Sequence, residues 1–265
     1  MKRLILAAML AAGVAGAAQA DDALKAAIAS GARTPANVTR DAARHPYETL
    51  TFFGIKPTMT VVEISPGGGW YTEILAPYLR DKGKLIAAGE SPDSKEAYAK
   101  RNADGLTKRL AERPALFDKV QRGLFEFPRA YNIAPPNSAD MVVTFRNLHN
   151  WTSSGDDAAR EALRKMHEVL KPGGILGVVD HRAKSDKPLD GKSGYLQEAH
   201  VIKLVESAGF KLAAKSEINA NPKDTADHNK GVWALPPVLA NKDVDREKYL
   251  AIGESDRMTL KFVKQ

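Results

Sequence analysis

The sequence predicts an α/β protein in which helices cover both faces of a mostly parallel β-sheet. Short apolar runs alternate along the chain with longer amphipathic stretches, and the runs lack the alternating polar residues of a half-exposed strand. Such runs are typical of strands that are buried on both faces. Strand and helix in alternation favour a parallel sheet, because parallel strands need a crossover connection between them.

The composition is that of an ordinary globular protein. Hydrophobic residues make up 43 % of the 265 residues and charged residues 27 %, which excludes disorder for most of the chain. The sequence has no cysteine, and this excludes disulfides, thiolate metal sites and cysteine nucleophiles. The net charge is +7, but Lys and Arg are interleaved with Asp and Glu throughout. We therefore expect no nucleic-acid partner.

Residues 1–20 have the pattern of a secretory signal peptide. Lys2 and Arg3 precede the apolar run Leu4–Ala17, and the small-residue site Ala18-Gln19-Ala20 follows it. The alternative is an uncleaved membrane anchor, but the run is shorter than the roughly 20 residues that a spanning helix needs. We therefore expect cleavage after this site, a periplasmic mature protein and no stable membrane insertion.

Three short helices are expected before the first strand. They are Ala23–Ser30, a helix that begins at Pro35 and ends before His45-Pro46, and Tyr47–Phe53, which ends at Gly54. We therefore expect a helical N-terminal cap over residues 21–54, followed by the main domain over residues 55–265.

Hydrophobic spacing predicts the elements of the main domain. Strands are expected at Met59–Ile64, Lys84–Ala88, Asp140–Phe145, Ile175–Val179 and Met258–Val263. Two sets of residues recur at helical spacing: Ala159, Leu163, Met166 and Leu170, and then Val201, Leu204, Val205 and Ala208. The stretch 219–256 is irregular and is expected to form an insertion before the last strand.

A glycine-rich loop joins the first buried strand to a helix. It reads Glu63-Ile64-Ser65-Pro66-Gly67-Gly68-Gly69-Trp70-Tyr71-Thr72. Glycines let a ligand approach the amides at a helix N-terminus, and ligands of open parallel sheets bind beyond the carboxyl ends of the strands. The alternative is a plain turn. A nicotinamide oxidoreductase is disfavoured, because the dinucleotide fingerprint needs a third glycine where Thr72 stands.

This loop resembles the first motif of class I S-adenosylmethionine-dependent methyltransferases, acidic-x-G-x-G-x-G, with Ser65 at the first glycine position. The resemblance continues over residues 46–218, through the second strand in 83–92, the fourth in Asp140–Phe145, and the turns Leu170-Lys171-Pro172-Gly173-Gly174 and Ala208-Gly209-Phe210. More closely, the chain resembles a group of exported, predicted methyltransferases of unknown substrate. The resemblance implies a Rossmann-like class I methyltransferase fold with the last strand inserted antiparallel.

The resemblance also implies S-adenosylmethionine as the cofactor. Glu90 is expected to bind the ribose hydroxyls, since a carboxylate can accept from both, although the family's usual spacing places that acid at Gly89. Leu124-Phe125-Glu126 is expected to follow the third strand, where the family holds the adenine. The expected cofactor residues are Glu63, Ser65, Pro66, Gly67, Gly68, Gly69, Trp70, Glu90, Ser91, Phe125, Glu126, Arg146 and Asn147.

The loop Arg146–Trp151 follows the fourth strand and faces the transferred methyl group in this fold. It lacks the Asn/Asp-Pro-Pro-aromatic signature of enzymes that methylate amide or adenine nitrogens. His149 is the candidate base, because the ordinary pKa of histidine is near neutrality. Alternatively, His149 only hydrogen-bonds the loop or stacks on the adenine. Trp151 either covers the cofactor or belongs to the core.

Asp180 and His181 end the next strand and are rival candidates for the base. Together with His149 they offer a carboxylate and two imidazoles, the donor set of a zinc or iron site. The six histidines of the chain lack short ligand spacings, so we expect no metal.

We therefore expect S-adenosylmethionine-dependent methyl transfer to a small-molecule nucleophile. In this fold, the insertion 219–256 covers the substrate pocket or forms a structural flap. The sequence sets no oligomeric state. Because S-adenosylmethionine is made in the cytosol, an exported enzyme needs a supply of it. The alternative is a non-catalytic protein that binds a small ligand and retains the methyltransferase fold.

Overall fold

The structure is a computed structural model that describes residues 22–184 and 192–265. The expected signal peptide, residues 1–20, lies outside the described residues. Within them, no helix is both long enough and apolar enough to cross a membrane.

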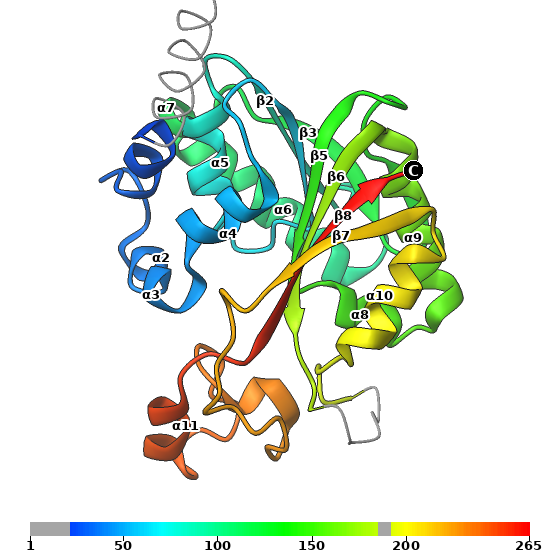
Figure 1. Cartoon of the computed structure of the whole chain (residues 1–265). Coiled ribbons are helices and arrows are strands. Elements are labelled where there is room, and N and C mark those ends of the chain that lie inside the picture. Colours follow the sequence, from blue (N-terminus) through cyan, green and yellow to red (C-terminus); the bar gives the residue numbers. More distant parts are fainter. Residues whose placement is uncertain (1–21, 185–191) are drawn as a thin grey trace, which may run out of the picture.

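One eight-stranded sheet runs through the described part of the chain, in the order β4-β3-β2-β1-β5-β6-β8-β7 (Figure 1). The strands are β1 (Thr60–Ile64), β2 (Lys84–Gly89), β3 (Gln121–Glu126), β4 (Ala130–Asn132), β5 (Ala139–Phe145), β6 (Leu170–His181), β7 (Phe210–Ser216) and β8 (Arg257–Lys264). The five strands β3, β2, β1, β5 and β6 pair in parallel, whereas β8 is antiparallel to both β6 and β7. The expected parallel sheet with an antiparallel last strand is confirmed. The short edge strand β4, antiparallel to β3, has no counterpart in the sequence prediction.

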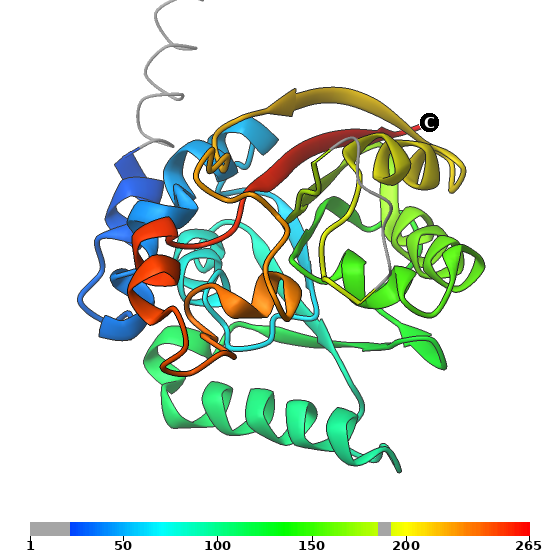
Figure 2. The ribbon, with the colours of Figure 1, turned by 90° about the horizontal axis from the view of Figure 1, so that it is seen from below.

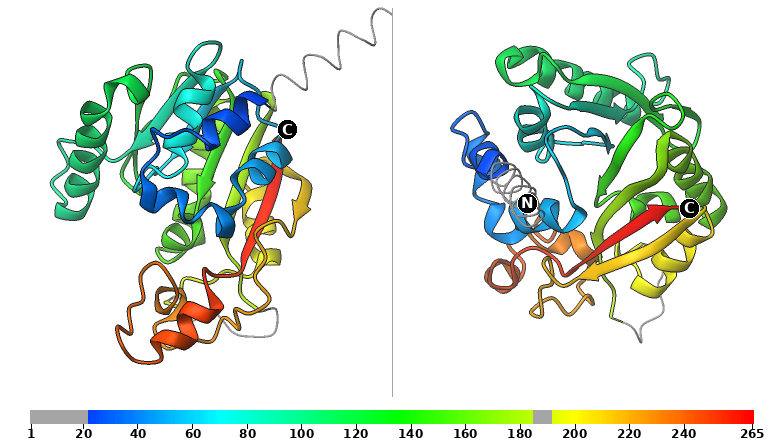
Figure 3. Two further views of the ribbon diagram at one scale, coloured as in Figure 1. Left: turned by 90° about the vertical axis from the view of Figure 1, so that its left-hand side faces the viewer. Right: turned by 45° about the horizontal axis from the view of Figure 1, so that its top comes forward.

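Helices cover the sheet on both sides (Figure 3). They are α2 (Pro35–Val38), α3 (Asp41–Arg44), α4 (Pro46–Phe53), α5 (Thr72–Leu79), α6 (Ala97–Glu112), α7 (Pro114–Phe117), α8 (Leu148–Thr152), α9 (Asp156–Val169), α10 (Glu198–Glu206), α11 (Arg246–Ile252) and the 3-10 helix η1 (Gly231–Ala234). Residues 22–28 are also helical.

The helix expected from Pro35 to just before His45-Pro46 is interrupted. Two four-residue helices, α2 and α3, take its place. Thr39 lies between them, and its Oγ1 donates a hydrogen bond to the Ala36 carbonyl at 3.0 Å. Such a local side-chain bond competes with continuation of a helix.

Two further boundaries differ from the prediction. Leu170, expected on the face of α9, begins β6 and pairs with Ala139. The chain becomes extended there because Pro172 disfavours helical geometry just before it. Leu124-Phe125-Glu126 was expected to follow the third strand, but these residues end β3.

Successive residues of the central strands point to opposite faces of the sheet, and both faces are buried. In β1, Val61 packs with the N-terminal helices, α4, α5 and α7, whereas Val62 and Ile64 pack with α8, α9 and α10. Met141 and Val142 of β5 alternate in the same way. The N-terminal cap therefore completes one of the two hydrophobic cores.

The carboxyl ends of the parallel strands meet at one end of the sheet. There the glycine-rich loop follows β1, Glu90 follows β2 and the loop at Arg146 follows β5. Figure 2 looks at this end from below, and the insertion 219–256 with η1 and α11 lies in front of it. The candidate site residues from distant parts of the sequence are thereby brought to one place.

Gly177 of β6 allows α4 to approach the sheet closely. A Cβ at this position would lie 2.7 Å from Cδ2 and 2.8 Å from Cε2 of Phe53, whose side chain is fully buried. We expect Gly177→Ala to lower the free energy of unfolding by about 1–3 kcal/mol, the usual cost of overpacking a core, as measured by urea denaturation. Gly105→Ala in α6 is the matched control, because nothing lies within 4 Å of its Cβ. It should instead stabilise by about 0.5–1 kcal/mol, and equal midpoints for the two variants would contradict the close packing.

Candidate active site

The glycine-rich loop after β1 forms a tight turn. The φ angles of Ser65, Gly67 and Gly69 are +49°, +54° and +74°, in the left-handed region that favours glycine. Ser65 therefore adopts a glycine-like backbone at the position where the methyltransferase motif has its first glycine. The side-chain amide of Asn147 donates to the carbonyls of Ile64 and Ser65, at 3.1 and 3.3 Å, and holds this turn against the end of β5.

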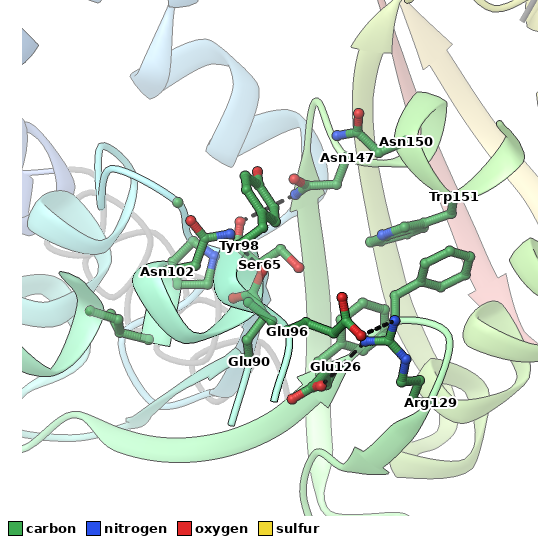
Figure 4. A pocket seen from close by; sticks show the side chains of 16 residues that line it. Ser65, Glu90, Glu96, Tyr98, Asn102, Glu126, Arg129, Asn147, Asn150 and Trp151 are labelled. Atoms are coloured by element: carbon green, nitrogen blue, oxygen red, sulfur yellow. Dashed lines mark hydrogen bonds and ion pairs between the residues drawn. The ribbon is translucent and has the colours of Figure 1, made fainter. Parts of the chain in front are cut away.

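A cavity of about 420 Å³ opens beside this loop, beyond the ends of β1, β2, β3 and β5 (Figure 4). We call it the β2–β3 cavity. It is lined by Ser65, Pro66, Gly67, Glu90, Glu96, Tyr98, Ala99, Asn102, Leu106, Phe125, Glu126, Phe127, Arg129, Asn147, Asn150 and Trp151.

Glu90 lies at the end of β2 and lines this cavity. Its Oε1 accepts a hydrogen bond from Nδ2 of Asn102 at 2.9 Å, so α6 fixes the direction of the carboxylate. Figure 4 shows Asn102 and Tyr98 on one side of the cavity and Trp151 and Asn150 on the other. Because each carboxylate oxygen has two lone pairs, Glu90 keeps the capacity to accept further hydrogen bonds from a ligand.

Aromatic rings form one wall of the cavity. The ring centroid of Trp151 lies 5.1 Å from that of Phe125 and 6.1 Å from that of Phe127. Trp151 is only 3 % exposed and packs into the core that includes α9 and α10. Trp151 is therefore a core residue that also borders the cavity.

Two other expected cofactor residues have structural partners. The carboxylate of Glu126 accepts from Oγ of Ser94 at 2.7 Å and from the amide of Ser91 at 3.1 Å. These bonds fix the loop after Glu90. Neither Ser91 nor Gly69 lines the β2–β3 cavity or the second cavity described next.

A second cavity of about 180 Å³ lies across the glycine-rich loop, toward the N-terminal cap. We call it the arginine cavity. It is lined by Asn37, Arg40, Arg44, Glu63, Ile64, Ser65, Pro66, Gly67, Gly68, Trp70, Tyr71, Phe145, Arg146 and Asn147. Ser65, Pro66, Gly67 and Asn147 line both cavities, so a ligand that follows the loop can reach from one cavity into the other.

Glu63 ends β1 and is 2 % exposed. Its Oε2 accepts a hydrogen bond from Oγ1 of Thr72 at 2.7 Å. Burial raises the pKa of Glu63 to about 7, although the Thr72 bond and the positive charge of Arg109 pull it down. The carboxyl group is therefore partly protonated at neutral pH.

His149, Asp180 and His181 come together at the ends of β5 and β6. Nδ1 of His149 lies 2.8 Å from Oδ1 of Asp180, and the backbone amides of His149 and His181 donate to the same carboxylate at 3.3 and 2.8 Å. Because a carboxylate only accepts, Nδ1 of a neutral His149 carries the proton and Nε2 is the acceptor. This is the arrangement of a general base with an orienting carboxylate.

His181 is held differently. Its Nδ1 lies 2.5 Å from Oγ of Ser255. Burial, with smaller effects from His149 and Arg146, holds the pKa of His181 well below its usual value. His181 is therefore neutral at neutral pH and a weaker base than an ordinary histidine.

The same three residues form a group of possible metal ligands, with ligand atoms within 4.8 Å of one another. Nδ1 of each histidine already has a partner, Asp180 for His149 and Ser255 for His181. The two Nε2 atoms and one lone pair on Oδ2 of Asp180 would remain for an ion. The bonds already made orient the ring of His149, which suits it to proton transfer.

The insertion 219–256 reaches the three residues. The ring of Trp233 lies 6.2 Å from that of His149, and Ser255 contacts His181. These contacts place the insertion against His149 and His181.

Several lining residues were not identified from the sequence. Tyr98, Asn102 and Asn150 belong to no motif. Tyr98 and Asn102 stand at i and i+4, a spacing that puts both side chains on one side of α6, and this spacing is the one signal that could have linked them. Arg40 and Arg44 lie on the N-terminal cap and also line a cavity. No local sequence pattern indicates that this cap packs against the insertion.

The raised pKa of Glu63 predicts a pH-dependent stability. Below the unfolded-state pKa near 4.5, the carboxyl is protonated in both the folded and the unfolded protein and costs no stability. As the pH rises from there to about 7, the unfolded protein ionises more readily than the folded protein, so the folded protein loses stability. Glu63→Gln should therefore be more stable than the wild type by up to about 3 kcal/mol at pH 8, with the gap closing toward pH 5. Urea denaturation at several pH values measures the gap, and a gap that stays constant with pH would contradict the burial effect.

The family model for a methyltransferase domain matches residues 62–178. No curated protein matches the chain. A solved S-adenosylmethionine-dependent methyltransferase from Aquifex aeolicus has a TM-score of 0.58 at 17 % identity, over 86 % of this chain and 93 % of that chain.

Two further solved structures have the same fold. The cyclase SpnF has a TM-score of 0.58 at 16 % identity, over 89 % of this chain and 84 % of its own. An O-methyltransferase from neocarzinostatin biosynthesis has a TM-score of 0.52 at 14 % identity, over 86 % of this chain and 56 % of its own. At such identities the likeness shows the fold alone. Together with the family-model match, it identifies residues 62–178 as a methyltransferase domain with the class I S-adenosylmethionine-dependent fold, and it supports S-adenosylmethionine as the cofactor.

Proposed function

We propose that the mature chain is an exported enzyme that transfers the methyl group of S-adenosylmethionine to an oxygen, nitrogen or carbon atom of a small molecule. The observation that carries this proposal is the buried 2.8 Å contact between Nδ1 of His149 and Asp180. An acceptor atom that bears a proton needs a base, and other acceptors need only positioning. Export rests on the signal-peptide pattern of residues 1–20.

The residues around the two cavities fit the cofactor. Glu90 has a carboxylate suited to the ribose hydroxyls, and the rings of Phe127 and Trp151 offer flat surfaces for the adenine. The turn at Gly67 leads from the β2–β3 cavity to the arginine cavity, so the amino-acid end would lie along it. When bound, S-adenosylmethionine supplies an electrophilic methyl group.

His149 is the proposed base. Its Nε2 would take the proton from the acceptor atom, and the Asp180 carboxylate would hold the ring in place and stabilise the imidazolium that forms. The sequence left Asp180 and His181 as rivals. Asp180 is fully buried with three donors on its carboxylate, which suits it to orienting His149. The lowered pKa of His181 makes it the weaker base.

A hydroxyl-bearing small molecule is the favoured acceptor. The similar O-methyltransferase from neocarzinostatin biosynthesis was solved with S-adenosyl-L-homocysteine and 1,4-dihydroxy-2-naphthoic acid. A hydroxyl group must lose its proton during transfer, which is the task that the His149–Asp180 pair would perform.

The second candidate function is a non-catalytic ligand-binding protein. The similar fold of SpnF, which is named a cyclase, supports the view that this architecture does not by itself specify methyl transfer. The need for S-adenosylmethionine outside the cytosol favours this alternative. Cofactor binding and turnover separate the two functions.

Calorimetric titration tests cofactor binding. We expect S-adenosylmethionine and S-adenosylhomocysteine to bind the mature chain at micromolar concentration. Glu90→Ala should weaken both by roughly 10- to 100-fold, because hydrogen bonds to a charged acceptor are lost. Glu161→Ala, a surface change on α9, is the control and should leave the affinities unchanged. If neither compound gives heat up to millimolar concentration, the methyltransferase function is wrong.

Transfer of a labelled methyl group to a panel of phenols, hydroxy acids and amines tests the base. We expect His149→Ala to lower turnover of any accepted compound by roughly 10²- to 10⁴-fold, with the affinity for S-adenosylhomocysteine unchanged. A chelator should leave the wild-type rate unaltered. Unchanged turnover in His149→Ala would remove this residue from the mechanism, and loss of activity with the chelator would favour a metal at the three residues.

A further inference from the structure

Helix α6 presents one stripe of side chains to the crevice. Tyr98, Asn102 and Leu106 line the β2–β3 cavity, and Arg109 follows on the same helix. Successive members of this set are separated by four, four and three residues, a spacing that places them on one side of a helix. The same side of α6 can therefore contact both the β2–β3 cavity and the glycine-rich loop.

Arg109 lies against the glycine-rich loop. Its Nη1 donates a hydrogen bond to the carbonyl of Gly67 at 3.1 Å. A Cβ at Gly69 would lie 2.8 Å from Cδ and 3.2 Å from Nε of Arg109, so the arginine side chain crosses the turn in close contact with its backbone. Gly69 lines neither the β2–β3 cavity nor the arginine cavity. The absence of a side chain at Gly69 thus makes room for Arg109.

Side chains from two other elements hold the turn. Asn147, which follows β5, donates to the carbonyls of Ile64 and Ser65, and Arg109 of α6 donates to that of Gly67. Ser65 has a φ angle of +49°, which is unfavourable for a residue with a Cβ. The two side chains therefore help to keep a shape that the residue at position 65 does not favour by itself.

The bond to Gly67 also sets the direction of the next amide. In a trans peptide, the C=O of one residue and the N–H of the following residue point in opposite directions, and the bond between Gly67 and Gly68 is trans. Because Arg109 holds the Gly67 carbonyl, the amide of Gly68 points away from the guanidinium. Gly68 lines the arginine cavity, toward which the amino-acid end of the cofactor would lie.

Helix α6 packs on the fold through a small apolar face. Three of its sixteen residues are buried, and two of these are alanines. Figure 2 shows the helix along the margin of the molecule. From this position Asn102 contacts Glu90 after β2, and Arg109 contacts Gly67 after β1. The helix therefore joins the two segments that would bind the cofactor, which follow two neighbouring parallel strands.

We infer that Arg109 is a positioning residue of the cofactor site, which holds the Gly67 carbonyl and thereby aims the Gly68 amide at the amino-acid end of S-adenosylmethionine. This inference rests on the proposed function. Arg109 lines neither the β2–β3 cavity nor the arginine cavity, so it acts through the loop. Its loss affects the binding of the amino-acid end and leaves the binding of the adenosine unchanged.

Calorimetric titration of the mature chain with two adenosine compounds tests this role. Methylthioadenosine has the adenosine of S-adenosylhomocysteine without its amino-acid end. Arg109→Met keeps an unbranched side chain but removes the donors. We expect it to weaken S-adenosylhomocysteine roughly three- to tenfold, the effect of one lost hydrogen bond, and methylthioadenosine by less than about twofold. Arg109→Lys should recover part of the lost affinity, because its ammonium group can donate to the same carbonyl.

Two variants of the same helix are the controls. Lys108→Met removes the neighbouring charge, which pairs with Glu112 on the surface, and should change neither affinity. Asn102→Ala removes the bond to Glu90 and should weaken both compounds, since both carry the ribose. The inference is wrong if Arg109→Met weakens the two compounds equally or weakens neither. It is also wrong if Lys108→Met weakens S-adenosylhomocysteine as much as Arg109→Met does.

Amide hydrogen exchange of the ligand-free chain separates this inference from the proposed function. A peptide that covers residues 65–71 should exchange faster in Arg109→Met than in the wild type, because the loop opens more often, and at the wild-type rate in Lys108→Met. If neither adenosine compound binds the wild type, the proposed function fails, and faster exchange in Arg109→Met would still support this residue as the one that holds the loop. Unchanged exchange in Arg109→Met would overturn the inference.

Discussion

The carboxylate of Asp180 accepts hydrogen bonds from the backbone amides of His149 and His181 and from Nδ1 of His149. It is fully buried, and a buried carboxylate is tolerated only when it has such donors. Asp180 lies near the end of β6 and His149 follows β5, so these bonds join the ends of two neighbouring parallel strands. The direction of the imidazole therefore depends on the register that pairs Phe145 with Val179.

The charge of the site comes from the periphery of the fold. Arg44 belongs to the N-terminal cap and Glu254 to the insertion, and they interact although they are 210 residues apart in the sequence. Glu254 has a pKa lowered to about 2 because Arg257, Arg40 and Arg44 together outweigh the effect of burial. The cap and the insertion are thus joined through an ionic cluster at the border of the crevice. The insertion 219–256, which the sequence predicts only as a cover or flap, therefore contributes to the electrostatics of the site through Glu254.

The sequence predicted the sheet, and it predicted that His149 and Asp180 both reach the crevice, because the carboxyl ends of parallel strands lie at one end of a sheet. It did not predict the role of Glu126, which fixes the loop at Ser91 and Ser94. That role depends on a turn whose shape no motif specifies. The sequence also did not predict that arginines gather around Glu254. Contacts such as that between Arg44 and Glu254 arise from tertiary packing and leave no periodic signal in the sequence. The predicted end of the helix at Leu170 was wrong, because Pro172 outweighed the helical spacing of the apolar residues and Leu170 begins β6 instead.

We propose that one crevice holds the adenosine beside Glu90 and leads the amino-acid end along the glycine-rich loop toward the arginine cavity, with His149 beside the reacting centre. A crystal structure of the mature chain with S-adenosylhomocysteine tests it most directly. We predict that the ribose hydroxyls contact Glu90, that the adenine lies in the β2–β3 cavity near Trp151, and that the sulfur faces His149. An adenosine bound elsewhere, or a sulfur turned away from His149, would contradict this placement of the cofactor.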